Sequence, residues 1–185
     1  MIILASASPR RKEILEQAGI DFEIIPSNYD ESSLEVTTID EYSKKLSYYK
    51  ALDVFNKHPN DTIIASDTIV VINDQILGKP KNEDDAFDML SKLQGNKHSV
   101  ITSVCIMKED KIDNFISKSY VSFYKMTPED IKEYISTKEP MDKAGAYAIQ
   151  GKAAKYIRSI NGDYYTIVGL PIAKVVKSLK KLKAI

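Results

Sequence analysis

The sequence predicts an α/β fold in which a strongly twisted mixed β-sheet is flanked by helices. Short apolar, β-branched runs that are typical of strands alternate with longer segments that begin at helix-capping residues. The run at 62–72, TIIASDTIVVI, is nearly all apolar and predicts a central strand that is buried on both faces. A chain of 185 residues suits one domain with a sizeable core.

The first elements are a strand, a tight loop and a helix. An apolar run from Ile2 to Ala5 predicts a buried strand. Ser8 suits the N-cap of the following helix, and Pro9 suits its first position, where a missing N–H costs nothing. Gly19 is typical of the end of such a helix. A short second strand at 22–25 and a polar, acidic loop at 28–36 complete this part of the chain.

Capping residues place the next helix. Thr38 and Glu41 form a capping box, so we expect a helix from there to about Asn56. Its expected inner face consists of Tyr42, Leu46, Tyr49 and Phe55.

Turn signals organise the middle of the chain. The pair Asn73-Asp74 predicts a hairpin turn that follows the central strand and returns at 76–77. Asn82 is expected to cap a helix that reaches about Leu93. Two alternating runs, at 97–107 and 112–126, predict a long antiparallel pair.

The last third begins with a helix and ends with one. The segment TPED at 127–130 predicts a helix start, and the small residues at 141–151 predict irregular backbone that approaches a ligand or partner closely. Asn161-Gly162 predicts a hairpin between strands at 153–160 and 164–168. A lysine-rich closing helix follows Pro171, and its cations near the C-terminus suit the helix dipole.

Composition excludes several classes of function. Twenty-six basic and 26 acidic side chains give a net charge of zero, which disfavours a bulk electrostatic grip on nucleic acid or on an anionic membrane. One cysteine and two histidines are too few for a usual zinc site, and we expect Cys105 to be a reduced core residue. No signal pattern or membrane-length apolar stretch is visible, so we expect a cytoplasmic protein.

Cations crowd the N-terminal end of the first helix, where the helix dipole disfavours them. Arg10, Arg11 and Lys12 lie in the first turn, beside the hydroxyls of Ser6 and Ser8 and the free backbone N–H groups. A bound phosphate chain would resolve this conflict of charge. A basic, solvated first turn is an equally good interpretation.

Asp67 interrupts the central strand, where a carboxylate is costly unless it is paired, hydrogen-bonded or metal-bound. This favours a functional role, with an aspartate satisfied by neighbouring backbone as the alternative. Together with an acidic residue of the Asp30-Glu31 loop, Asp67 is suited to hold Mg²⁺, which prefers few carboxylates plus waters and phosphate oxygens. Asp67 is also suited to orient or deprotonate a water, while Lys50 and Lys79 would neutralise leaving phosphates. The absence of a Walker motif and of a Gly-rich dinucleotide loop disfavours ATP-driven and redox chemistry.

Eight short motifs follow one another along almost the whole chain. They are SASPRR at 6–11, DES at 30–32, YKA at 49–51, SDTIV at 66–70, GKP at 78–80, GNKHSVITSV at 95–104, DKAGAYAIQG at 142–151 and NGDYYTIVGLP at 161–171. In these motifs the chain resembles the Maf family of nucleoside triphosphate pyrophosphatases. The resemblance implies a single Maf/ITPase-like domain over residues 1–185, with two lobes around a central active-site cleft.

The resemblance also implies a reaction. Such enzymes hydrolyse a nucleoside triphosphate between the α and β phosphates, with a divalent cation, Mg²⁺ or Mn²⁺, and release the monophosphate and pyrophosphate. Asp67 matches the family's proposed catalytic acid/base, and Arg10, Thr68 and Gln150 match positions linked to substrate choice. The AIQG sequence at 148–151 resembles the branch that acts on dTTP, UTP and modified pyrimidine nucleotides. The other matching polar positions of the pocket are Ser6, Ser8, Arg11, Glu31, Lys50 and Lys79, with Glu31 and Asp67 as the metal ligands.

Other polar and aromatic residues fit this interpretation without deciding it. The Gln150 amide offers both a donor and an acceptor, which suits the edge of a uracil or thymine ring, although an ordinary loop amide is the alternative. Ser66 stands where many relatives have alanine, and we expect His98 to be structural. The tyrosines of the last third are expected in the core or in an interface, and the resemblance implies a homodimer: Tyr147, Tyr156, Tyr164 and Tyr165.

Two other functions remain open on the sequence alone. One is a nucleotide-binding regulator of septum formation without catalysis, since related chains are associated with inhibition of septum formation. The other is a pyrophosphatase for deaminated purine nucleotides such as ITP, which the Gln150 match disfavours.

Overall fold

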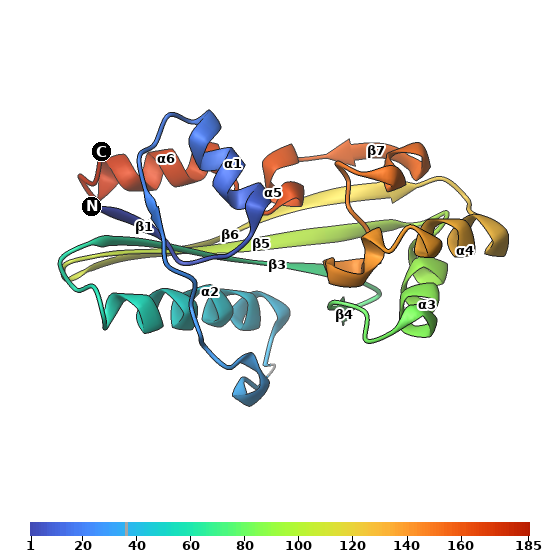
Figure 1. The fold of residues 1–185 in the computed structure, drawn as a ribbon, viewed down its shortest axis with the longest axis horizontal. Coiled ribbons are helices and arrows are strands. Elements are labelled where there is room, and N and C mark those ends of the chain that lie inside the picture. The colour runs from blue at the N-terminus through green and yellow to red at the C-terminus, as the bar shows by residue number, and fades with distance from the viewer. Residues whose placement is uncertain (36) are drawn as a thin grey trace. The chain divides into compact units, whose positions relative to one another are not determined.

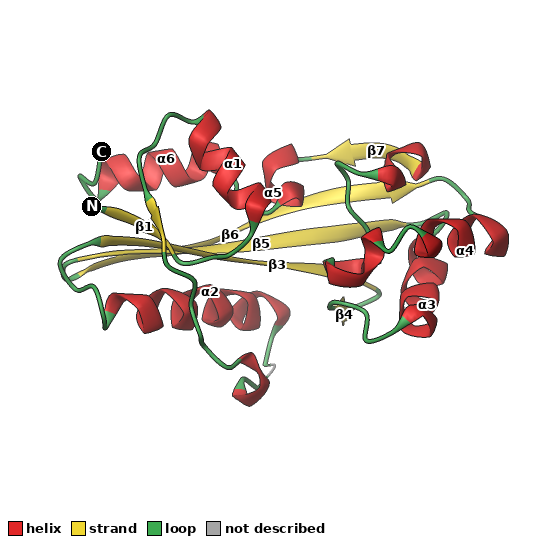
Figure 2. Cartoon of the chain, viewed as in Figure 1, coloured by secondary structure: helices red, strands yellow, loops and turns green. Residues whose placement is uncertain are grey.

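A computed structural model describes residues 1–35 and 37–185 and confirms the predicted mixed α/β architecture (Figures 1 and 2). The sheet has the order β2-β1-β3-β5-β6-β7, and β4 pairs with β3. The strands are β1 (Ile2–Leu4), β2 (Glu23–Ile24), β3 (Thr62–Ile72), β4 (Gln75–Leu77), β5 (Lys97–Lys108), β6 (Lys111–Phe123) and β7 (Ile157–Asn161). The α-helices are α1 (Pro9–Gln17), α2 (Ile39–Phe55), α3 (Glu83–Leu93), α4 (Pro128–Ser136), α5 (Tyr164–Val168) and α6 (Ile172–Lys181).

The chain divides into two compact units. Unit 1 comprises Met1–Asp67, Thr102–Ser117 and Gly169–Ile185, and unit 2 comprises Thr68–Ile101 and Lys118–Val168. Val36, the last residue of the predicted acidic loop, lies outside the described residues. No helix in the described part of the chain combines the length and the apolar character needed to cross a lipid bilayer.

Unit 1 is built on parallel strands. Strand β1 pairs in parallel with β2 and with β3, so that Ile3 lies opposite both Glu23 and Ile63. Helix α2 covers one face of the sheet, while α1 and α6 cover the other (Figure 1). Cys105 is fully buried in this core, as predicted, and burial raises the pKa of its thiol to about 12.

Helix α2 begins at Thr38 as predicted, but it buries a different face from the one expected. Leu46 is buried, whereas Tyr42, Tyr49 and Phe55 are only partly so. Most of the buried side chains of this helix are small, so the helix can lie close to the sheet. Besides Leu46, the buried residues are Ser43, Ser47, Ala51 and Val54.

Strand β3 has the predicted bounds and burial on both faces, apart from one interruption. Ile63, Ile64 and Ala65 are completely buried, and only Asp67 and Thr68 in the middle of the strand are partly exposed. The tight turn after β3 also forms as predicted, with Asn73 and Asp74 both at positive φ. Strands β5 and β6 are neighbours joined by two residues, so they run antiparallel.

Unit 2 packs helices α3 and α4 together beside short 3-10 helices (Figure 2). Thr127 and Asp130 form the capping box that starts α4, and the backbone N–H of Thr127 lowers the pKa of the Asp130 carboxyl. His98 is 2% exposed and lies 2.7 Å from the Tyr147 hydroxyl through Nε2, which confirms a local structural contact. The 3-10 helices are η1 (Glu31–Ser33) in unit 1, and η2 (Glu139–Asp142), η3 (Ala144–Ala146) and η4 (Lys152–Tyr156) in unit 2.

The predicted hairpin around Asn161-Gly162 is wrong. Only 157–161 forms a strand, β7, which pairs antiparallel with β6, while 152–156 is 3-10 helix and 164–168 is helix α5. The Asp163 carboxylate accepts the backbone N–H of Tyr165 at 2.9 Å, so it acts as a helix cap where a second strand was expected.

Candidate active site

Three charged side chains of unit 1 converge at one point. Lys50 projects from α2, and its ammonium lies 2.5 Å from Oδ1 of Asp67 in β3. The same ammonium lies 2.6 Å from Oε1 of Glu31 in η1. The Lys50 and Asp67 side chains are 16% and 14% exposed, whereas Glu31 is 48% exposed. A mostly buried carboxylate and an outer one therefore share a single cation.

The two carboxylates keep the Lys50 ammonium charged. Burial alone would lower the pKa of Lys50, but the attraction and hydrogen bonds of Asp67 and Glu31 outweigh it, so the pKa is raised. Nearby, burial raises the pKa of Tyr42, and the same two carboxylates raise it further. At neutral pH the lysine is therefore charged and the tyrosine is neutral.

The structure separates the two acidic residues of the loop. Asp30 caps η1, since its Oδ1 accepts the backbone N–H of Ser32 at 2.9 Å and the Ser32 hydroxyl at 2.7 Å. These hydrogen bonds lower the pKa of Asp30. Glu31, in contrast, pairs with Lys50, and its role as a metal ligand stays a prediction.

The loop before α1 is shaped by Ser6. Its Oγ accepts the backbone N–H of Ser8 at 3.2 Å and Nη1 of Arg11 at 3.0 Å. Ser8 is the N-cap of α1 by its backbone conformation, but its side chain makes no capping hydrogen bond. The Ser8 side chain therefore satisfies none of the backbone N–H groups in the first turn of α1, and phosphate binding at this turn stays a prediction.

One backbone carbonyl connects α1 with β3. Gly169 O accepts Nε of Arg11 at 2.9 Å and the Ser66 hydroxyl at 3.0 Å, and Ser66 directly precedes Asp67. Burial lowers the pKa of Arg11, the Asp67 carboxylate opposes this effect, and the Arg10 charge adds to it. The charges of Asp67 and Arg10 therefore both act on the guanidinium of Arg11.

Comparison with known proteins shows the family of this chain. The family described as Maf, Maf-like protein, matches residues 1–182. The chain belongs to the Maf family. A "dTTP/UTP pyrophosphatase" of Geobacillus sp. (strain WCH70) is 46% identical over 181 residues, which cover 98% of this chain and 97% of that protein. Proteins with the same name from Acholeplasma laidlawii (strain PG-8A) and Bacillus cereus (strain G9842) are 48% and 44% identical, cover 97% of this chain each, and are themselves covered over 95% and 94%.

A solved structure was also found. It is described as "The structure of the Staphylococcus aureus Ham1 protein" and matches with a TM-score of 0.43 and 18% identity. The match covers 84% of this chain and 90% of that one.

The other residues predicted for the Maf site belong to unit 2. Thr68 follows Asp67 along β3 and is partly exposed. Lys79 is exposed just after β4, where the carbonyl of the preceding Gly78 accepts the backbone N–H of Gly145 at 3.0 Å. Gln150 is exposed in a turn. Unit 1 holds the remaining residues: Ser6, Ser8, Arg10, Arg11, Glu31, Lys50 and Asp67.

The carboxylates of this Maf protein fit a divalent cation. Asp67 and Glu31 supply hard oxygen ligands from separate segments of the chain, and both already approach one cationic group within 2.6 Å. No cluster of three or more His, Cys, Asp or Glu side chains that could hold a metal occurs in the described ranges. Two carboxylates match the way Mg²⁺ binds, with waters and phosphate oxygens completing its shell.

Sequence reasoning missed the roles of Ser66 and Gly169. The sequence marks Ser66 only as a departure from relatives with alanine, and Gly169 only as the start of the closing helix. Gly169 has φ +128° and offers its carbonyl to two donors. A backbone carbonyl that accepts hydrogen bonds cannot be recognised from the sequence, apart from the glycine that provides it.

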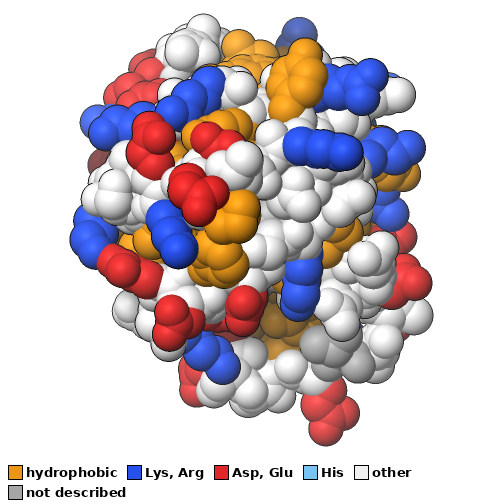
Figure 3. Space-filling view, turned by 90° about the vertical axis from the view of Figure 1, so that its right-hand side faces the viewer, with side chains coloured by type: hydrophobic (Ala, Val, Ile, Leu, Met, Phe, Trp, Pro, Cys, Tyr) orange, Lys and Arg blue, Asp and Glu red, His pale blue; other side chains and the backbone are white. Residues whose placement is uncertain are grey.

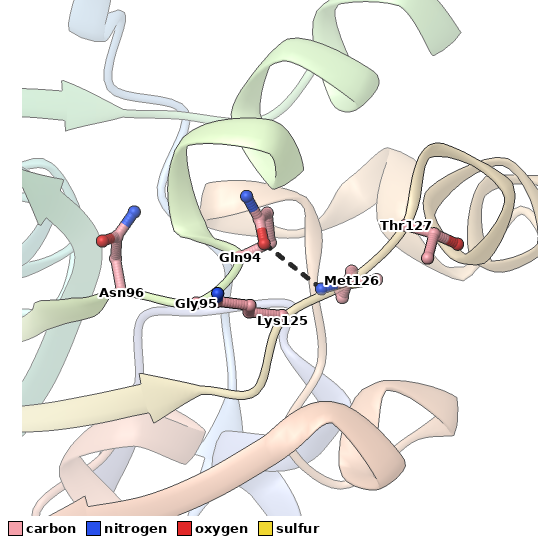
Figure 4. A pocket seen from close by; sticks show the side chains of 6 residues that line it. All are labelled: Gln94, Gly95, Asn96, Lys125, Met126 and Thr127. Atoms are coloured by element: carbon pink, nitrogen blue, oxygen red, sulfur yellow. Dashed lines mark hydrogen bonds between the residues drawn. The ribbon is translucent and has the colours of Figure 1, made fainter.

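A separate pocket of about 500 Å³ lies in unit 2 (Figure 4). It is lined by Gln94, Gly95, Asn96, Lys125, Met126 and Thr127, and so by none of the predicted site residues. Gln94 Oε1 accepts the backbone N–H of Met126 at 3.2 Å, which ties the two walls of the pocket together.

The face of the molecule in Figure 3 carries acidic and basic side chains interspersed.

Proposed function

We propose that this Maf protein hydrolyses dTTP, UTP and modified analogues to the nucleoside monophosphate and pyrophosphate. The observation that carries the proposal is the group of Lys50, Asp67 and Glu31, whose two carboxylates also act electrostatically on Arg11 in the first turn of α1. The name dTTP/UTP pyrophosphatase, borne by relatives 44–48% identical over nearly their whole length, supports the choice of substrate.

The residues of the site divide the tasks of this reaction among them, and Asp67 takes two. The triphosphate binds to Arg10, Arg11, the hydroxyls of Ser6 and Ser8, and the N–H groups of α1. A water attacks the α-phosphorus, the new P–O bond forms as the bond from the α-phosphorus to the α–β bridging oxygen breaks, and pyrophosphate leaves with that oxygen. Asp67 orients this water and accepts its proton.

The remaining charges stabilise the reacting phosphates. Asp67 and Glu31 would hold Mg²⁺ or Mn²⁺, which when bound neutralises phosphate charge and polarises the P–O bonds. Lys50 and Lys79 neutralise the negative charge on the departing pyrophosphate. Thr68 and Gln150 contact the nucleoside, with the amide of Gln150 facing the pyrimidine edge.

We further propose that residues 1–185 form one Maf-like pyrophosphatase domain and that the protein acts as a cytoplasmic homodimer. The single domain is supported by the family model, which matches residues 1–182, and the homodimer and the location follow from the resemblance to the Maf family. The proposed reaction involves neither a membrane nor a nucleic acid polymer.

The first experiment incubates the protein with dTTP, UTP or ITP and Mg²⁺ and measures pyrophosphate. We expect pyrophosphate from the two pyrimidine nucleotides and little from ITP. Chelation of the metal should abolish the reaction and added Mg²⁺ should restore it. Release of orthophosphate in place of pyrophosphate would contradict cleavage at the α–β bridge.

The matching variant is Asp67→Asn, which keeps the shape of the side chain but removes its charge. We expect turnover to fall by about a factor of 10² or more, with the unfolding transition retained. Asp61→Asn is a suitable control, because Asp61 pairs with the N-terminal ammonium at 3.0 Å, away from the Lys50 group. Full activity of Asp67→Asn would remove Asp67 from the reaction.

A further inference from the structure

A buried tyrosine and a partly buried glutamate meet beside the turn that carries Gln150. Tyr134, on α4, donates its hydroxyl proton to Oε2 of Glu139 at 2.6 Å. Tyr134 is 2% exposed, and burial together with this hydrogen bond raises the pKa of its hydroxyl, which therefore remains a donor at neutral pH. We name these two residues the Tyr134–Glu139 pair.

The pair holds the turn at both ends. The turn runs from Ala148 to Gly151, is closed by a hydrogen bond from the last N–H to the first carbonyl at 3.1 Å, and has Gln150 as its third residue. Before the turn, the N–H of Ala148 donates to the tyrosine hydroxyl at 3.1 Å. After it, the N–H of Lys152 donates to both carboxylate oxygens at 3.1 and 3.0 Å. Two side chains thus fix the backbone on either side of Gln150.

Gly151 leaves room for the Glu139 carboxylate. Its φ of −114° and ψ of −151° are extended values that residues with side chains also adopt, so the backbone conformation does not require glycine. A Cβ at this position would overlap the Glu139 carboxylate. What requires glycine here is the space that the carboxylate occupies.

We infer that Tyr134 and Glu139 are positioning residues that fix the direction in which Gln150 meets the base, and so set the preference for pyrimidine nucleotides. The inference rests on the proposed function, in which Gln150 contacts the base. Gln150 is exposed, and an amide carries a donor on one side and an acceptor on the other. It distinguishes one base edge from another only if its backbone is held in one place.

The first test compares Glu139→Ala and Tyr134→Phe with Glu133→Ala. Glu133 lies on the same helix as Tyr134 but is exposed and pairs with Lys155 at 3.0 Å, so it is a matched control. For the two test variants, kcat/KM with dTTP should fall about ten- to a hundredfold, and the preference for dTTP over dATP should shrink. An unchanged preference in a folded Glu139→Ala variant would overturn the inference, because a merely structural role lowers stability and not selectivity.

A double-mutant cycle isolates the route through Gln150. In a Gln150→Ala background, adding Glu139→Ala should cost less than about twofold, because the side chain that the pair positions is gone. Losses that simply multiply would show that Glu139 acts elsewhere.

Gly151 provides a second, independent cycle. Gly151→Ala alone should mimic Glu139→Ala, since the added methyl group displaces the carboxylate from Lys152. The double variant Gly151→Ala/Glu139→Ala should be no worse than Glu139→Ala alone. A double variant that is much worse would mean that Gly151 serves some purpose other than room for the carboxylate.

Amide hydrogen exchange tests the inference without using the reaction. The N–H groups of Ala148 and Lys152 should exchange at least about tenfold faster in Glu139→Ala than in the wild-type protein. In Glu133→Ala their exchange rates should equal those of the wild-type protein. Unaltered exchange would overturn the inference even in an active enzyme. Failure of the wild-type protein to release pyrophosphate from dTTP or UTP would instead refute the proposed function, so the two failures are distinguishable.

Discussion

At the scale of single residues, the position of the Lys50 ammonium bears on how a metal would bind to Asp67 and Glu31. The ammonium of Lys50 contacts one oxygen of Asp67 and one oxygen of Glu31, so a divalent cation bound to these two oxygens would have to displace it. In the proposed reaction the displaced ammonium turns toward the phosphates. The lysine would thus keep the two carboxylates together before the metal and substrate arrive.

This competition gives a prediction for Lys50→Met. Removal of the ammonium leaves two carboxylates without their shared partner, so the free energy of unfolding should fall by about 1–3 kcal/mol in metal-free buffer. Saturating Mg²⁺ should raise the Tm of the variant more than that of the wild-type protein, because the ion no longer competes with a lysine. Thermal unfolding with and without Mg²⁺ measures both effects.

The control for this experiment is Lys57→Met. Lys57 pairs with Asp53 at 2.8 Å but is 55% exposed, so its loss should change stability by less than about 0.5 kcal/mol and leave the effect of Mg²⁺ unaltered. Equal stabilisation of the wild-type protein and Lys50→Met by Mg²⁺ would contradict a shared position for the two cations.

At the scale of elements, helices and strands that depend on local sequence patterns were predicted correctly. The prediction was wrong where contacts between distant segments decide the local structure. Strand β3, the turn at Asn73-Asp74 and the start of α4 follow from apolar runs, positive-φ residues and a capping box. The segment after Gly162 carries an equally local hairpin signal, yet it becomes helix α5. Ser119 on β6 donates to the Asp163 carbonyl at 2.8 Å, and this partner is 44 residues away in the sequence.

The same distinction applies to the candidate site. Asp67 was singled out by its position in the central strand and Lys50 by its charge, whereas the choice of Glu31 within the Asp30-Glu31 loop came from the resemblance to the Maf family. The structure brings these three side chains together. The sequence could not reveal that Gly169 O joins Arg11 to Ser66, because any residue has a backbone carbonyl.

The segment at 141–151 gives a prediction at this scale. Its small residues are expected to approach a ligand or partner, and that expectation stays a prediction, but Gly145 approaches β3 of its own unit. A Cβ at Gly145 would lie 2.9 Å from both Cγ atoms of Val70, at a φ of +70°. We expect Gly145→Ala to lower the free energy of unfolding by about 2–4 kcal/mol, through backbone strain and overpacking.

Gly19→Ala is the control that separates the two causes. Gly19 has a similar φ of +66°, but no neighbouring atom lies within 4 Å of the place that an added methyl group would take, so only the strain of about 1 kcal/mol should appear. Denaturant unfolding of both variants gives the difference, which reports the collision with Val70. Equal losses would show that unit 2 accommodates the methyl group by moving the turn.

For the molecule as a whole, the buried His98 makes stability depend on pH in a range that few other groups affect. Its ring lies edge-on to Phe123 and Tyr147, its Nε2 contacts the Tyr147 hydroxyl, and its Nδ1 is buried without a partner among the described residues. Burial lowers the pKa of His98 from 6.5 to about 4. Above pH 6.5 the ring is neutral in both the folded and the unfolded chain. Between pH 6.5 and 4 the unfolded chain gains a proton that the folded chain refuses, so stability falls as the pH falls.

The chain's two histidines allow this to be measured directly. From pH 7 to pH 5, the free energy of unfolding of the wild-type protein should fall by about 2 kcal/mol through His98. His98→Gln should lose most of this dependence, although it is less stable at pH 7, while His58→Gln should keep it because His58 is 35% exposed. Urea unfolding of the three proteins at both pH values decides the matter. An equal decline in His98→Gln would assign the effect to other groups, whereas its loss would show that this buried ring causes the decline in stability between pH 7 and pH 5.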